Sequence, residues 1–214
     1  MRRRDAFTLL EVLLSLALVG LLFVALNTFI FSMGELWGRN GDVRLLDQHV
    51  NAVTRFINQE FLAASHPPAA RVNSTPIGIQ SVTPASGTAD NLVTFELPQG
   101  SRFLTWPDRP LPEVVCSLQA RPNDGLYLLW HSRLETRFTE DPPRETLLSP
   151  FVNALEYDYY DDNFKKWTTE TVLRTDSSGA QLMPQRLRLL FVYGKLQRQT
   201  TVPVPVMIQG IPNY

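Results

Sequence analysis

The chain has 214 residues, of which 44% are hydrophobic, with a formal net charge of −1 and a single cysteine. This length suits one domain, or one domain with a stalk, and is enough to bury a sizeable core. The slightly acidic balance gives no electrostatic case for binding nucleic acid, and one cysteine excludes an intrachain disulfide.

The first feature along the chain is an apolar run that follows three arginines. Arg2, Arg3 and Arg4 precede the stretch from Phe7 to Phe31, in which Glu11 is the only charged residue. A helix of about 20 apolar residues can span a bilayer, so this run is predicted to cross a membrane once. The arginines favour a cytoplasmic N-terminus and place the rest of the chain on the far side. A carboxylate at membrane depth costs roughly 2.5–3.5 kcal/mol, so Glu11 is predicted to be functional.

The segment Ala6-Phe7-Thr8-Leu9-Leu10-Glu11, behind a basic leader, resembles the N-terminus of type IV pilins and type II secretion pseudopilins. In that family a prepilin peptidase cuts after a small residue and methylates the new N-terminus. The resemblance implies cleavage between Ala6 and Phe7 and N-methylation of Phe7. It also implies that Glu11, the fifth mature residue, contacts the N-terminal amine of a neighbouring subunit. The family usually has glycine where this chain has Ala6.

Elementary chemistry agrees with such a pairing. Cleavage would leave an α-amino group on Phe7, which is largely cationic at neutral pH. Glu11 would lie about 6 Å farther along the helix axis, and a staggered neighbour's amine could offset the burial of its carboxylate. Three other interpretations stay open: Glu11 reaching the cytoplasmic interface within an isolated helix, an uncleaved signal anchor, and a cleavable secretory signal. The last has a shorter apolar core, of about 7–15 residues.

A second helical segment with one apolar face follows the membrane run. Gly34, Gly38 and Gly41 lower helix propensity, so local unwinding or a kink is expected between them. Beyond them, apolar residues recur at spacings of three and four up to the expected helix end before Pro67. These residues are Val43, Leu46, Val50, Val53, Ile57, Phe61 and Ala64. The first five are predicted to pack on a partner surface, for which the rest of the chain is the natural candidate.

The remainder has the pattern of short strands separated by turns. Strands are expected near residues 77–79, 92–97, 114–118, 126–130, 133–138, 155–160, 164–167, 186–193 and 196–202. The predicted fold class is α+β, a long N-terminal helix packed on one or two antiparallel sheets. The predicted domains are a leader (1–6), a transmembrane and polymerisation helix (7–34), an amphipathic stalk helix (35–65) and a β-rich periplasmic head (66–214).

The run from Leu147 to Asp162, followed by Lys166-Trp167 and by Gln181 to Phe191, is similar to the J-type minor pseudopilin of type II secretion. This resemblance implies a pilin-like fold and a structural subunit of the periplasmic pseudopilus tip, anchored in the bacterial inner membrane. It implies partners among the I-, K- and H-type minor pseudopilins and the major pseudopilin. Neighbouring minor-pilin types share looser versions, so a minor pilin of a surface type IV pilus, used for adhesion or DNA uptake, is the alternative.

Enzyme chemistry has little support in the sequence. His49, His66 and His131 lie in no recognisable nucleophile or metal spacing, and Cys116 is expected to be a small core residue. The acidic group at residues 158–163 could bind calcium through its oxygens, although a solvated turn is the other interpretation. The chain is therefore predicted to be a structural subunit without enzyme activity, cofactor or metal, and an anchored periplasmic enzyme or binding protein is the remaining alternative.

Overall fold

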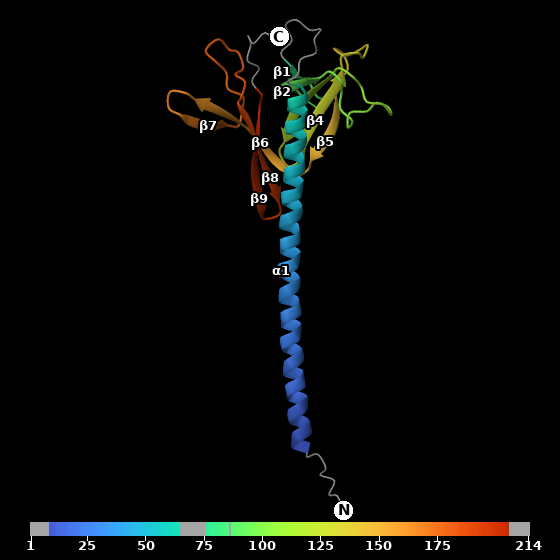
Figure 1. Ribbon diagram of the computed structural model, residues 1–214, viewed down its shortest axis with the longest axis vertical. Helices are drawn as coiled ribbons and strands as arrows, with labels where there is room; N and C mark the ends of the chain where they lie inside the picture. Colours follow the sequence, from blue (N-terminus) through green and yellow to red (C-terminus); the bar gives the residue numbers. More distant parts are fainter. Residues whose placement is uncertain (1–8, 65–75, 86, 206–214) are drawn as a thin grey trace, which may run out of the picture. The chain divides into compact units, whose positions relative to one another are not determined.

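The computed structural model describes residues 9–64, 76–85 and 87–205, with the side chains of residues 35–40 left out. The chain divides by its internal contacts into residues 1–47 and residues 48–214. A single helix followed by nine strands is found in the described ranges (Figure 1). This order of elements, with every strand pairing antiparallel, confirms the predicted α+β fold.

The helix, α1, runs from Leu9 to Ala64 over 56 residues. It stays helical through Gly34, Gly38 and Gly41, so the predicted local unwinding is wrong. Each glycine costs about 1 kcal/mol relative to alanine, but a break would leave backbone N–H and C=O groups without partners on both of its sides. No proline lies in α1 to force that break.

The first sheet is a meander of five strands that follow one another in sequence. Its strands are β1 (Ile77–Val82), β2 (Asp90–Leu97), β3 (Val114–Arg121), β4 (Gly125–Ser132) and β5 (Arg144–Ser149). The β3–β4 turn depends on Gly125, whose φ of 114° favours glycine and whose added Cβ would lie 2.3 Å from the Ser149 carbonyl oxygen. The turn predicted between these two strands is therefore confirmed.

The second sheet has four strands in the order β7-β6-β8-β9. Its strands are β6 (Val152–Asp161), β7 (Lys166–Glu170), β8 (Arg186–Tyr193) and β9 (Leu196–Pro203). The β8–β9 hairpin turns at Gly194, between the two strands expected near residues 186–193 and 196–202. Pro203 ends the edge strand β9, a position where a missing backbone N–H leaves no gap in the ladder.

The core of residues 48–214 lies where the end of α1 meets the first sheet. Ile57 and Phe61 are almost fully buried, and the Phe61 ring packs edge-on against Phe95 of β2 with centroids 5.1 Å apart. Cys116 of β3 lies directly opposite Phe95 and is fully buried, as expected for a core cysteine. The Cys116 face of the sheet is therefore the one that α1 covers.

The segment Arg133–Phe138, predicted as a strand, is instead a series of turns. Ser132 initiates them, because its backbone N–H donates to the Glu135 carboxylate and its hydroxyl accepts from the Leu134 N–H. Such side-chain bonds give the backbone partners other than a sheet ladder. The second strand that pairs with β4, besides β3, is β5, which lies farther along the chain and which no sequence pattern had predicted.

Candidate functional site: an acid in an apolar helix

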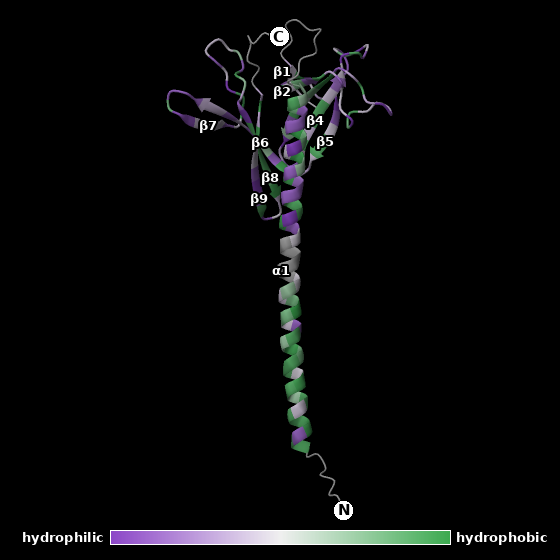
Figure 2. Ribbon diagram, in the orientation of Figure 1, coloured by the Kyte–Doolittle hydropathy of each residue, from purple (hydrophilic) through white to green (hydrophobic). Residues whose placement is uncertain are grey.

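The start of α1 is long and apolar enough to cross a membrane. The segment Leu9–Gly34 meets this criterion by length and composition, and the hydropathy colouring shows how strongly apolar this half of the helix is (Figure 2). None of its most apolar window is buried inside the chain. Its side chains therefore need an apolar environment from outside the chain, either lipid or other helices.

Four polar side chains of this segment bond to the helix's own backbone. Each donates to a carbonyl oxygen three or four residues earlier, at 2.9–3.1 Å. They are Ser15, Asn27, Thr28 and Ser32. Because water is absent from a bilayer core, polar groups there must find partners within the protein. These four residues satisfy that requirement without a second chain.

Glu11 lies in the first turn of α1 and is exposed. A carboxylate near a helix N-terminus is stabilised by the partial positive charge of the unpaired N–H groups there. A carboxylate can accept several hydrogen bonds, and those from a cationic donor are the strongest. The predicted cleavage and methylation positions, Ala6 and Phe7, lie outside the described residues.

The five residues predicted to pack on a partner surface differ in how far the structure buries them. Val50, Val53 and Ile57 are buried within residues 48–214, so the surface that covers them belongs to the chain itself. Leu46 is also buried and Val43 is half-buried.

His49 joins α1 to both sheets. Its Nε2 lies 2.8 Å from the hydroxyl of Ser149, which ends β5, and its ring packs edge-on against Phe151 and against Phe191 of β8. Burial lowers the pKa of His49, because the charged imidazolium loses hydration there. The neutral ring is therefore the form that the folded head, here taken as residues 48–214, prefers.

Acidification is expected to destabilise the head through this residue. Since the folded-state pKa of His49 is lowered, the unfolded chain takes up the proton first, and stability falls as the pH drops below about 6.5. One proton changes the free energy of unfolding by at most about 1.4 kcal/mol per pH unit. Denaturant unfolding of the full chain at pH 5.5 and 7.5 measures this slope. His49→Gln should flatten the slope, and equal slopes in parent and variant would contradict the assignment.

The acidic residues considered as calcium ligands have two different structural roles. Asp158 is almost fully buried and accepts hydrogen bonds from both Arg188, at 3.1 and 2.9 Å, and Thr169, at 2.7 Å. Asp161 instead accepts from the backbone N–H groups of the next turn. Among the described residues no group of three or more His, Cys, Asp or Glu side chains is arranged to hold a metal.

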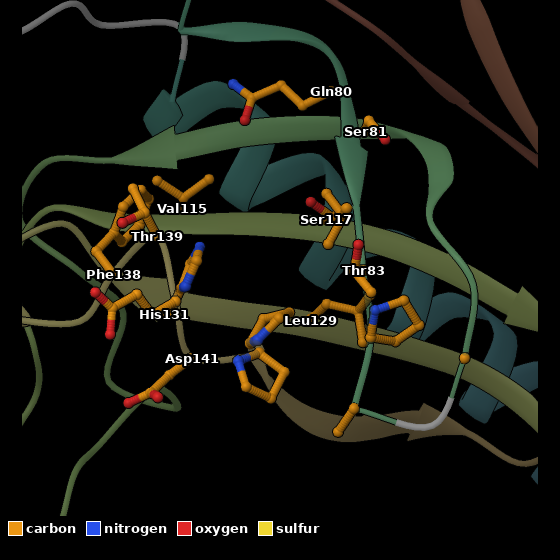
Figure 3. Close-up of a pocket in the computed structure, with 17 residues that line it drawn as sticks. Gln80, Ser81, Thr83, Val115, Ser117, Leu129, His131, Phe138, Thr139 and Asp141 are labelled. Atoms are coloured by element: carbon orange, nitrogen blue, oxygen red, sulfur yellow. The ribbon is translucent and has the colours of Figure 1, made fainter.

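His131 lies at a hollow on the first sheet (Figure 3). Its ring stacks on Phe138, with centroids 4.0 Å apart, and burial lowers its pKa. The hollow is built from β1, β3, β4 and residues of two loops, 83–85 with 87 and 138–143, that are far apart in sequence. The sequence singles out His131 but not the hollow, because no pattern in one segment indicates which loops meet in space.

The comparisons with known proteins identify the N-terminal segment. A family model described as the prokaryotic N-terminal methylation motif matches residues 1–27, which include Ala6, Phe7 and Glu11. Searches of curated proteins and of solved structures returned no match. The chain therefore carries, at its N-terminus, the prepilin signal of type IV pilin-like proteins, which prepilin peptidase processes.

Proposed function

We propose that the chain is a minor pseudopilin, a structural subunit at the tip of the periplasmic pseudopilus in type II secretion. The observation that carries the proposal is the methylation motif at the apolar start of a 56-residue helix, together with the nine antiparallel strands that come later in the chain. The resemblance of residues 147–191 to the J-type subunit supports the choice within the pilin-like proteins. The role is assembly, and no chemical step is assigned to the chain.

Assembly would move the apolar helix from lipid into a bundle of subunit helices. The exposed apolar surface of Leu9–Gly34 suits both environments, and its polar side chains are already bonded within the helix. Glu11 would fix the register by accepting from the methylated amine of Phe7 on a neighbouring subunit. The N-terminus would lie in the cytoplasm and the head in the periplasm, where the head selects I-, K- and H-type partners and the major pseudopilin.

The alternative, a minor pilin of a surface pilus, shares the methylation motif and differs in its partners. Cross-links can distinguish the two if they start from an exposed position of α1. Leu45 is 62% exposed, whereas Val50, Val53 and Ile57 are buried in the head and cannot report on a partner. Cross-links from Leu45 to secretion pseudopilins would favour the proposal, and cross-links to pilus subunits would overturn it.

Processing is expected to produce a chain that begins with N-methylated Phe7. The small Ala6 side chain lets the peptidase cut after it, which removes the leader and its three arginines. Intact-mass and N-terminal peptide mass spectrometry of membrane-extracted protein measure both changes. The matched control is the same chain expressed without prepilin peptidase, which should keep Met1. A mature chain that starts elsewhere, or an unmethylated Phe7, would contradict the proposal.

A further inference from the structure

The hollow on the first sheet lies on the face that α1 does not cover. Side chains alternate across a strand, so Val115 and Ser117 of β3 point away from Cys116, whose face meets α1. The hollow has a volume of about 530 Å³, within the range of about 300–1,000 Å³ found for small-molecule sites. Leu129 and Val115 give it an apolar floor, and residues 83–85, which follow β1, also line it (Figure 3).

Inside this hollow the Ser117 hydroxyl can form a further hydrogen bond, in addition to the one with Thr94. Its hydroxyl lies 2.7 Å from the hydroxyl of Thr94, and Thr94 can also donate to the Leu92 carbonyl oxygen, at 3.2 Å. A hydroxyl has one proton and two lone pairs. If Thr94 donates to Leu92, Ser117 donates to Thr94 and keeps both lone pairs. If Thr94 donates to Ser117, the Ser117 proton stays available. In either arrangement Ser117 can bond to a ligand.

His131 adds a donor and an acceptor close to Ser117. Val115, two residues from Ser117, is directly opposite His131 in the β3–β4 register, and both His131 and Ser117 line the hollow (Figure 3). The imidazole makes no side-chain hydrogen bond to any residue in the described ranges. Burial keeps it neutral at neutral pH by lowering its pKa, so one ring nitrogen donates and the other accepts.

The other polar groups around the hollow are uncharged or acidic. Hydroxyls and one amide contribute from the loops and from β1, namely Gln80, Ser81, Thr83 and Thr139. The charged lining residues are Glu140 and Asp141, both exposed at the rim and both paired with Arg137. Among the described residues, no lysine or arginine lines the hollow. A phosphate or carboxylate would therefore meet the acidic groups of the rim, where Arg137 is already paired with them.

We propose that this hollow is a binding site for an uncharged saccharide. Sugar hydroxyls both donate and accept, as do Ser117, the neutral His131 and the surrounding threonines. The apolar floor formed by Val115 and Leu129 suits the C–H faces of a sugar ring. The site would give the subunit a ligand of its own, in addition to its assembly contacts, and it does not depend on the N-terminal signal.

NMR titration of the full-length chain tests the proposal. The chain is held in micelles of a zwitterionic detergent without a sugar headgroup, since a maltoside would compete for the site. The probes are maltose and N,N′-diacetylchitobiose at millimolar concentration, with glucose 6-phosphate as the charged comparison. At least one uncharged probe should shift the His131 ring resonances saturably, and glucose 6-phosphate should not.

Two variants test whether ligand binding depends on the polar groups of side chains that line the hollow. Ser117→Ala removes a ligand-facing hydroxyl, and His131→Phe keeps the ring stack but removes both nitrogens. Each should weaken binding by about tenfold, the usual effect of losing a hydrogen bond of roughly 1 kcal/mol or slightly more. Thr94→Val breaks the same hydroxyl pair from outside the hollow and should change affinity by less than about twofold. No saturable shift with any uncharged probe, preferred binding of glucose 6-phosphate, or equal losses in Thr94→Val and Ser117→Ala would overturn the proposal.

Discussion

Glu11→Ala is expected to reduce recovery of assembled subunits by about a hundredfold to several thousandfold. In the proposed filament the Glu11 carboxylate accepts from a neighbour's cationic N-terminus inside an apolar bundle. Removing one partner of a buried pair costs about 3–5 kcal/mol, because the other charge stays buried without compensation. Insertion into the membrane should not suffer, since deleting a carboxylate from the apolar run removes a cost of roughly 2.5–3.5 kcal/mol.

Two measurements on the same cells separate assembly from insertion. Membrane fractionation follows insertion, and co-purification with tagged pseudopilins follows recruitment. Asp42→Ala is the matched control, because Asp42 is an exposed acid on the same helix outside Leu9–Gly34. It should assemble normally. Unchanged co-purification of Glu11→Ala would refute the register role, while loss of both insertion and recruitment would show that the acid serves membrane entry instead.

Local periodicity is what made most of the fold predictable. The apolar stripe of α1 and the alternation in β2, β6 and β8 are properties of one segment, so a single sequence shows them. The error at Arg133–Phe138 has a different origin. That segment has strand-forming residues, but the Ser132 and Glu135 side chains bond to nearby backbone groups and produce turns.

Features that depend on partners distant in sequence could not be predicted. β5 carries charges and starts directly after two prolines, and its edge position is stabilised by ion pairs of Arg144 with Glu135 and of Glu145 with Arg121. The hollow likewise needs two loops about 55 residues apart to meet over one sheet face. By contrast, Glu11 could be identified from the sequence alone, because a charged residue within an apolar run is unusual in itself.

Arg188→Met is expected to lower the free energy of unfolding of the head by about 3–5 kcal/mol. Arg188 lies on the central strand β8 and bonds both oxygens of Asp158, whose side chain is only 2% exposed. Without the guanidinium, that carboxylate would keep the Thr169 hydroxyl as its hydrogen-bond donor. This one hydrogen bond does not compensate for the hydration that a charged carboxylate loses on burial. Urea unfolding of the full chain, followed by tryptophan fluorescence, measures the change.

Arg186→Met is the matched control, because it removes an arginine from the same strand at an exposed position. Arg186 lies over the Trp167 ring, 3.9 Å from its centroid, and such a contact contributes about 1 kcal/mol or less when exposed.

The double variant Asp158→Leu, Arg188→Met should recover most of the stability, since replacing both partners leaves no buried charge. A loss below about 1 kcal/mol in Arg188→Met would show that water reaches Asp158. A double variant as unstable as the single one would show that β8 depends on the arginine stem for packing, and the electrostatic explanation would then fail.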